Sequence, residues 1–418
     1  MKINTNPVRG TRDFGPQDME LRDYVTDVIM KVYRRHGFTR IQTPILENID
    51  LLLGSEGGEN LKLIYKILKR GNKLNLTNDN LKEMDLVDMG LRYDLTLPLS
   101  RYYANNFSKL PTTFKGMQIG EVFRAERPQK GRYRSFYQCD IDIIGEESEV
   151  AEIELILTTS EALLALDFND FIIRINDRRI LSGLIKYAGF TDNDVNSVCI
   201  TFDKLDKIGL EGVEKELNSK EYSPEIVGNF ISIVEDITKG IEIKDMQKFG
   251  IEADVLNPLE NLITIVQKQS KGKYKIKFDP TIVRGMGYYT GLIYEVECEG
   301  LGVSIAGGGR YDKMIGRFMK NDVPAVGFSI GFERILAIMQ DRNFKIPNNF
   351  SKIAFLFDKK KDKLIDVIEK SDDLRVEENT VALIPKGKKL GKQLDNLKAQ
   401  GYDSFCLYGE TNEIKKLD

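Results

Sequence analysis

The chain has 418 residues, of which 41% are hydrophobic and 30% charged, and its formal net charge at pH 7 is −3. This length exceeds what one hydrophobic core usually serves, so we expect two or three domains. The composition is typical of a soluble globular protein. Because the net charge is small, the whole chain does not indicate nucleic-acid binding, and any contact with RNA must come from local patches.

The sequence shows no segment typical of membrane insertion or secretion. No apolar run approaches the ~20 residues that span a bilayer. The first ten residues, MKINTNPVRG, lack the apolar core of a secretion signal. We therefore expect a cytoplasmic protein without membrane contact.

The residues that most often hold metals are few and scattered. The single histidine, His36, lies at the end of an expected helix. The four cysteines have no paired spacing, which argues against a zinc site and a disulfide framework, and we expect them to be small buried hydrophobes: Cys139, Cys199, Cys298 and Cys406. No metal site made of protein side chains is predicted, and histidine-based acid–base chemistry is nearly excluded.

The N-terminal part begins with a helix and a strand. Apolar residues recur at helical spacing over residues 16–35 and stop at Gly37, and residues 38–46 form a strand pattern interrupted by Pro44. Further on, Arg92, Asp94 and Thr96 occupy alternate positions, which predicts one face of an extended segment. An acidic group and a hydroxyl so placed can hold an ammonium group, although a polar strand edge has the same pattern.

A basic segment lies between two strand patterns, residues 121–123 and 135–144, which predicts an antiparallel hairpin with a long loop. Its cations are Arg124, Arg127, Lys130, Arg132 and Arg134. The period of two places one aromatic and three polar side chains on one face of the second strand: Phe136, Gln138, Asp140 and Asp142. Arginine binds phosphate with a planar fork and Phe136 can stack on a base, whereas composition alone favours an exposed, solvated hairpin.

The middle of the chain changes character twice. Residues 147–166 form an amphipathic helix pattern, and residues 176–270 are charged and helix-rich, which indicates an inserted helical domain. Strand patterns resume at 274–278 and 292–298. Between them, the three glycines of residues 283–291 let the backbone approach a ligand beside Arg284, Tyr288 and Tyr289, although a plain glycine-rich turn fits equally well.

The last third holds another glycine-bearing unit and a small domain. The run AGGGRYD at residues 306–312 is not followed by the lysine and serine of a P-loop. Residues 325–336 form a glycine-bearing strand that passes into a helix carrying Arg334. After a linker at residues 346–349, three short apolar strands alternate with helices, which predicts a small α/β domain.

These segments resemble the class II aminoacyl-tRNA synthetases, in the form of the histidyl-tRNA synthetases. Residues 123–138, FRAERPQKGRYRSFYQ, resemble motif 2, and the match is long and unbroken. The helix and strand ending in Pro44 resemble motif 1, which forms the dimer interface, and residues 325–336 resemble motif 3. Residues 92–96 resemble the amino-acid-binding element, and residues 284–289 resemble the histidine-specific motif.

The resemblance implies a fold and a division into domains. The fold is an α+β catalytic domain built on an antiparallel sheet of the class II synthetase type, formed by residues 1–175 and 271–346. It carries a helical insertion, residues 176–270, that reaches toward the tRNA acceptor stem. A C-terminal α/β domain, residues 352–418, resembles the anticodon-binding domain. The resemblance also implies a homodimer.

The resemblance further implies a reaction: histidine is activated with ATP to histidyl-adenylate and then transferred to the 3′ end of tRNA(His). No protein base is required, since the substrate carboxylate is the nucleophile, and Mg²⁺ bridges the outer phosphates. Three arginines are implied to be catalytic: Arg124 on the α-phosphate and substrate carboxylate, Arg284 on the α-phosphate, and Arg334 on the γ-phosphate.

Other residues are implied to bind the substrates. ATP also meets Glu126, Arg132 and Phe136. Histidine meets Asp94 and Thr96 through its α-amino group, and its other contacts are Gln138, Asp142, Tyr288, Tyr289 and Tyr311. The end of the tRNA acceptor stem meets Gln129 and Lys130.

A second interpretation comes from a different class of protein. The regulatory subunit of ATP phosphoribosyltransferase is a non-catalytic relative of these synthetases that binds histidine. That subunit typically lacks the C-terminal domain and several arginines that contact ATP. Arg124, Arg284 and Arg334 are all present in this chain, together with a C-terminal domain, so the ligase is the leading hypothesis.

Overall fold

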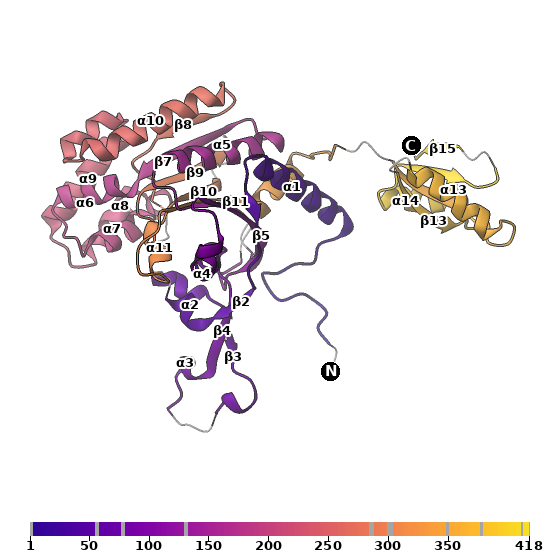
Figure 1. Ribbon diagram of the computed structural model, residues 1–418, viewed down its shortest axis with the longest axis horizontal. Helices are drawn as coiled ribbons and strands as arrows, with labels where there is room; N and C mark the ends of the chain where they lie inside the picture. The colour runs from indigo at the N-terminus through magenta and orange to yellow at the C-terminus, as the bar shows by residue number, and fades with distance from the viewer. Residues whose placement is uncertain are drawn as a thin grey trace. The chain divides into compact units, whose positions relative to one another are not determined.

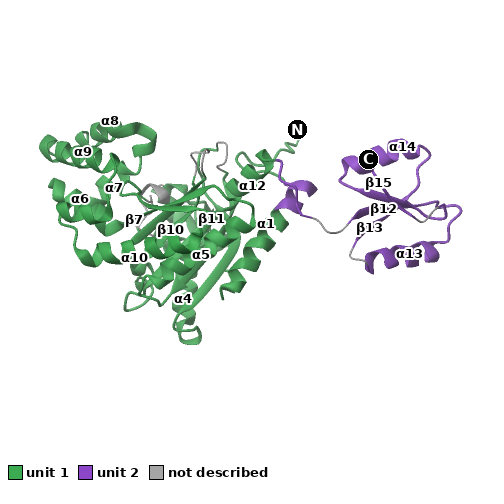
Figure 2. Ribbon diagram, turned by 90° about the horizontal axis from the view of Figure 1, so that it is seen from above, with its two compact units in different colours: residues 1–13, 22–342 green, residues 14–21, 343–418 purple. Residues whose placement is uncertain are grey.

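The computed structural model describes residues 3–54, 58–76, 80–128, 133–283, 288–298, 304–347, 351–376, 379–410 and 413–417. The chain forms two compact units, coloured separately in Figure 2. Unit 1 comprises Met1–Asp13 and Arg22–Arg342, and unit 2 comprises Phe14–Leu21 and Asn343–Asp418. This division keeps residues 176–270 within unit 1, so the limits predicted for an inserted domain stay a prediction.

An eight-stranded, mainly antiparallel sheet is the centre of unit 1 (Figure 1). Its strands, in spatial order, are β1 Thr39–Arg40, β5 Phe114–Phe123, β6 Ser135–Ile144, β11 Ala325–Gly331, β10 Ser304–Arg310, β9 Leu292–Cys298, β7 Phe171–Asp177 and β8 Lys275–Phe278. Only the outer pairs, β1 with β5 and β7 with β8, are parallel. The α+β fold of the class II synthetase type is therefore confirmed, as is the hairpin formed by β5 and β6.

Helices pack against this sheet through apolar side chains. The predicted first helix is confirmed as α1 Pro16–Arg35, and its Val25, Ile29 and Val32 are buried. α5 Val150–Ala165 contacts β6 and β11 and buries Leu155 and Ile156. Two short helices follow β10 and β11 in the chain, α11 Asp312–Gly316 and α12 Phe332–Asp341, respectively.

A smaller three-stranded antiparallel sheet belongs to the same unit, with strand order β2 Leu46–Asn48, β4 Val87–Leu91 and β3 Lys66–Leu68. The strand predicted over residues 38–46 is split at Pro44 into β1 and β2, which lie in different sheets. The nearby short elements are α2 Ile49–Leu53, α3 Glu83–Leu86, α4 Thr96–Asn106, and the 3-10 turns Gly58–Leu63, Gly71–Lys73 and Phe107–Lys109.

The segment between β7 and β8 is helical, as the sequence predicts. Its elements are α6 Arg178–Ala188, α7 Val195–Phe202, α8 Leu205–Asn218, α9 Pro224–Thr238, a 3-10 turn at Ile243–Phe249, and α10 Ala253–Ser270. The Asp177 carboxylate caps α6 by accepting a hydrogen bond from the Arg179 backbone N–H at 2.8 Å, and Gly189, with φ of 114°, ends it. Local capping signals thus begin and end this helix.

Unit 2 contains a four-stranded sheet in the order β13 Thr380–Pro385, β12 Lys352–Phe357, β14 Ser404–Leu407 and β15 Ile414–Lys416. The first three strands are parallel and β15 is antiparallel to β14. The connecting helices are α13 Leu364–Val376 and α14 Leu390–Ala399. The predicted C-terminal α/β domain is therefore confirmed as a fold. Among the residues that the structure describes, no helix has the length and apolar character needed to cross a membrane.

Candidate active site

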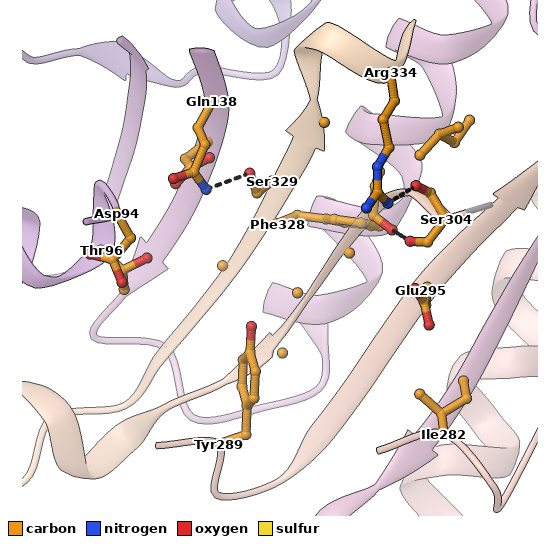
Figure 3. Close-up of a pocket in the computed structure, with 18 of the residues that line it drawn as sticks. Asp94, Thr96, Gln138, Ile282, Tyr289, Glu295, Ser304, Phe328, Ser329 and Arg334 are labelled. Atoms are coloured by element: carbon orange, nitrogen blue, oxygen red, sulfur yellow. Dashed lines mark hydrogen bonds between the residues drawn. The ribbon is translucent and has the colours of Figure 1, made fainter. Parts of the chain in front are cut away.

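A cavity of about 500 Å³ lies over the central strands of unit 1 (Figure 3). Glycines of β10 and β11 form part of its lining: Gly307, Gly308, Gly309, Gly327 and Gly331. A Cβ atom at Gly309 would lie 2.6 Å from the Leu292 carbonyl oxygen and 2.8 Å from the Tyr289 ring. Glycine at such positions lets neighbouring strands and the Tyr289 ring pack closely, because a side chain there would clash with them.

The polar face of β6 lines the cavity. Gln138, Asp140 and Asp142 stand opposite Gly331, Ser329 and Gly327 of β11, respectively. Gln138 Nε2 donates a hydrogen bond to Ser329 Oγ at 3.2 Å. Within the described part of the chain, three buried oxygens of this face accept no hydrogen bond: Gln138 Oε1, Asp140 Oδ1 and Asp142 Oδ2. Buried polar atoms are normally satisfied, so these acceptors indicate a ligand that brings N–H donors.

Asp142 is held in place by one aromatic hydroxyl. The Tyr311 hydroxyl donates a hydrogen bond of 2.6 Å to Asp142 Oδ1. Burial raises the pKa of Asp142 to about 7, although the Tyr311 hydrogen bond opposes this and the charge of Asp94 adds to it. The Asp142 carboxyl therefore changes charge near neutral pH, where imidazole also titrates.

Asp94 and Thr96 also line the cavity, but their backbone differs from the prediction. Thr96 is the first residue of α4 rather than part of an extended segment, and Asp94 Oδ1 accepts a hydrogen bond from the Leu97 N–H at 3.1 Å. Burial raises the pKa of Asp94, opposed by backbone hydrogen bonds and by Arg124. Arg92 is buried and bonded to the carbonyl oxygens of Glu121 and Thr43, so its role is structural.

Aromatic rings close the Asp142 end of the cavity. Tyr288, Tyr289 and Tyr311 all line it. The ring centroids of Tyr288 and Tyr289 are 4.8 Å apart, and those of Tyr288 and Tyr311 are 6.1 Å apart with nearly perpendicular planes. A flat ring with polar nitrogens fits a lobe that combines such aromatic faces with a carboxylate.

Cations line the other end of the cavity. The Arg124 guanidinium carbon lies 4.2 Å from the Tyr93 ring centroid and 5.0 Å from that of Phe136. Its Nε donates a hydrogen bond to the Tyr93 carbonyl oxygen at 3.2 Å. Arg334 comes from the first turn of α12 and donates to the carbonyl oxygen of Ser304. These contacts hold both guanidinium groups at the wall of the cavity, where a planar cation can meet an anion.

The sequence-predicted site is brought together only in part within the described residues. Of the three predicted catalytic arginines, Arg124 and Arg334 line one cavity. Arg284 lies outside the described residues, as do Gln129, Lys130 and Arg132. Glu126 and Phe136, predicted for ATP, also line the cavity. The predicted site residues that the structure describes thus line one cavity, and their roles stay predictions.

Several cavity residues were not predicted as site residues. Tyr93, Asp140 and Ser329 line the cavity, and so does Lys207 at the start of α8. Asp140 had a usable signal, because it shares the β6 face with Gln138 and Asp142. Lys207 had none, because its approach to the sheet depends on how the helical segment folds back.

Glu333 is a further residue that the sequence did not single out. Its carboxylate accepts hydrogen bonds from Arg12 at 2.7 Å and Arg22 at 2.9 Å, and it is 5% exposed. These pairs tie the first turn of α12, and with it Arg334, to the N-terminal region of unit 1. Glu333 therefore positions the strand-to-helix turn that carries Arg334.

Comparisons with known proteins agree with this geometry. A family model described as histidyl-tRNA synthetase matches residues 10–335. The chain is 39% identical over 427 aligned residues to a histidine–tRNA ligase of Leifsonia xyli subsp. xyli, with 99% of this chain and 97% of the relative covered.

Two solved structures resemble the chain over nearly its whole length. The crystal structure of histidyl-tRNA synthetase from Nostoc sp. PCC 7120 matches with a TM-score of 0.79 and 27% identity, covering 100% of this chain and 95% of that chain. A structure described as an ATP phosphoribosyltransferase regulatory subunit/histidyl-tRNA synthetase from Bacillus halodurans matches with a TM-score of 0.75, covering 95% of this chain and 97% of that chain. Its identity is 19%, so it shows the fold alone.

Proposed function

Because the chain belongs to the histidyl-tRNA synthetase family and is an aminoacyl-tRNA ligase for histidine, we propose that the cavity of unit 1 binds histidine and ATP side by side. One observation carries the proposal. Arg124 and Arg334 line one end of a single cavity, and the unsatisfied acceptors of β6 extend from there to Asp142 at the aromatic end. An anionic and a cationic group of two substrates can therefore occupy one continuous space.

Activation joins the two substrates by one displacement. A carboxylate oxygen of histidine attacks the α-phosphorus of ATP, a P–O bond forms, and the bond to pyrophosphate breaks. The substrate supplies the nucleophile, so the protein has to position the reactants and stabilise developing negative charge. We assign this work to Arg124 at the carboxylate and α-phosphate, to Arg284 at the α-phosphate, and to Arg334 at the γ-phosphate.

The nucleotide end offers contacts for the rest of ATP. Phe136 stacks on the adenine, with Glu126 at the base edge and Arg132 at the phosphates. Mg²⁺ enters with the phosphates and neutralises their charge. In the described part of the chain, no group of three His, Cys, Asp or Glu side chains could hold a metal ion by itself.

The amino-acid end recognises histidine by its nitrogens. Asp142, whose second oxygen is unsatisfied, accepts an imidazole N–H, and Tyr288, Tyr289 and Tyr311 surround the ring. Asp94, Thr96 and Gln138 receive the α-ammonium group. An analogue without these donors would leave buried acceptors unpaired, which gives strong discrimination.

Transfer to tRNA(His) needs contacts beyond this cavity. We assign the end of the acceptor stem to Gln129 and Lys130 in the loop between β5 and β6. Gln129→Ala then slows transfer of histidine to tRNA more than it slows adenylate formation. Single-turnover measurements of each step check this, and equal losses in both steps would contradict the assignment.

We further propose that the protein is a cytoplasmic homodimer. Apolar side chains on and beside the edge strands β2 and β3 support a subunit interface: Ile45 is 40% exposed, Leu46 48% and Leu68 55%. Exposed apolar side chains on edge strands normally require a covering partner. Sedimentation velocity on the wild type and on Leu46→Glu tests the dimer, and a wild-type monomer refutes it.

The decisive experiment is histidine-dependent exchange of pyrophosphate into ATP by the purified protein. The proposal expects exchange with histidine and no exchange with other amino acids. Histidine binding without any exchange would instead favour the non-catalytic regulatory subunit. The same assay on Arg124→Ala, with the exposed Arg34→Ala as matched control, separates loss of chemistry from a general effect of removing a cation.

A further inference from the structure

Asp140 is a buried carboxylate of the cavity that has no counter-charge in hydrogen-bond contact among the described residues. It is 3% exposed, and its Oδ1 accepts no hydrogen bond within the described part of the chain. The Ser329 hydroxyl, which receives the Gln138 amide N–H, donates to Asp140. Because the Ser329 oxygen accepts a hydrogen bond from Gln138, its hydroxyl hydrogen is directed toward Asp140. The amide oxygen of Gln138, Oε1, remains as an acceptor without a donor.

The position of Asp140 lies between the two ends of the cavity. It stands two residues from Asp142, at the aromatic end, and two residues from Gln138, which is nearer Phe136 on the same strand face. Burial raises the pKa of Asp140 well above its usual range, and the charges of Asp142 and Asp94 add to this. The Ser329 hydrogen bond and the charge of Arg124 oppose it, and a bound cation would oppose it further. A histidine with its imidazole at Asp142 and its carboxylate at Arg124 would place its Cα between them.

We propose that Asp140 is a binding residue for the α-ammonium group of the amino acid, acting with Asp94 and Gln138. An ammonium group has three N–H donors, and Asp140 adds a buried, unsatisfied acceptor to those that Asp94, Thr96 and Gln138 offer it. This inference rests on the proposed histidine-binding function of the cavity. It adds a specificity contact to the reaction, because a ligand without a cation at this position leaves Asp140 buried and uncompensated.

The competing explanation is that Asp140 is a core residue whose only partner is Ser329. That explanation leaves a buried carboxylate oxygen unsatisfied in both the free and the occupied protein. A ligand ammonium removes this difficulty, and Asp140 lines the cavity that such a group would enter. The two explanations differ in whether removing the charge changes ligand selectivity.

The test compares two analogues by isothermal titration calorimetry on the full chain. Histidinol keeps the ammonium and imidazole groups but has no carboxylate, whereas 3-(imidazol-4-yl)propanoate keeps the imidazole and carboxylate but has no ammonium. We expect Asp140→Asn to weaken histidinol binding by about 10- to 100-fold and to change propanoate binding by less than about threefold. Equal losses for both analogues, or a larger loss for the propanoate, would overturn the inference.

Two further variants keep the result unambiguous. Glu152→Gln neutralises a buried carboxylate outside the cavity, and it should leave the ratio of the two affinities unchanged. If Asp140→Asn does not fold, Ser329→Ala removes the donor that orients Asp140. The inference then expects a larger change for histidinol than for the propanoate, and parallel changes would overturn it.

Failure of the proposed function gives a different result. If Asp140→Asn weakens histidinol binding but the wild type shows no pyrophosphate exchange, the ammonium site is supported and the proposed ligase activity is refuted. If the wild type exchanges pyrophosphate but Asp140→Asn changes the affinities for both analogues equally, the ligase activity is supported and the ammonium site is refuted.

Discussion

Two buried carboxylate sites in unit 1 differ in how their oxygens are satisfied. Glu152, 1% exposed, accepts hydrogen bonds from Arg310 Nε at 2.6 Å and Arg310 Nη2 at 2.8 Å. On the face of β6, Asp140 and Asp142 are as deeply buried, yet each keeps one oxygen without a donor in the described part of the chain. The first site has its hydrogen bonds complete, whereas the second keeps acceptors that we propose a ligand fills.

The electrostatics of the two sites follow from this difference. Burial lowers the pKa of Arg310, but its hydrogen bonds to Glu152 outweigh this and raise it. Arg310 therefore keeps its charge, whereas burial raises the pKa of Glu152 against the opposing effect of Arg310. The two side chains hold α5 to the end of β10. Burial raises the pKa of Asp142 to about 7 with only a neutral hydroxyl opposing it, so its charge is available to respond to a substrate.

The largest expected effect that tests this comparison is on activity. Asp142→Asn keeps the shape of the side chain and its acceptor for Tyr311 but removes the charge that receives the imidazole N–H. We expect kcat/KM for histidine in pyrophosphate exchange to fall about 1000-fold, with the KM for ATP nearly unchanged. The exposed Asp23→Asn is the matched control, and a loss of ATP binding of similar size would contradict the division of the cavity into two ends.

The next largest effect is on stability. Glu152→Gln leaves Arg310 without its bidentate partner, although Asp312 remains at 3.3 Å. We expect the free energy of unfolding to fall by about 3 kcal/mol, because one member of a buried ion pair loses its counter-charge. Urea denaturation measures this, with the exposed Glu147→Gln as control. If the stability loss were absent while histidine activation was lost, Glu152 would belong to the functional site.

The smallest effect is a pH dependence of stability. The folded-state pKa of Asp142 is about 7 against an ordinary value of 3.8, so its contribution to stability decreases as pH rises through this window and levels off above about pH 7. Asp142→Asn should therefore be more stable than the wild type at pH 8. We expect this advantage to shrink by about 2 kcal/mol between pH 8 and pH 5.

Urea denaturation at the two pH values, on both proteins, measures this advantage directly. An advantage that grew toward pH 5 would show that the Asp142 carboxyl is stabilised in its charged form. The comparison between the Glu152 and Asp142 sites would then lose its basis.

Part of the site could be predicted because its signals are local. Alternation along residues 135–144 correctly assigned Gln138 and Asp142 to one face of β6 and predicted the hairpin with β5. The same pattern was extended wrongly to Asp94 and Thr96, because the backbone turns into α4 at Thr96. A capping carboxylate at Asp94 could have indicated this helix start, since it bonds to the N–H of Leu97.

Periodicity and motif spacing in the sequence by themselves determined which side chains share a strand face, where the helical segment lies, and the family resemblance. Only the tertiary structure decided that β6, β10, β11 and the start of α4 line one cavity, that Asp140 lies between its two ends, and that Glu333 ties α12 to Arg12 and Arg22. The physical reason is range: the period of a strand is set by neighbouring residues, whereas a cavity depends on strand order and register between segments far apart in the chain.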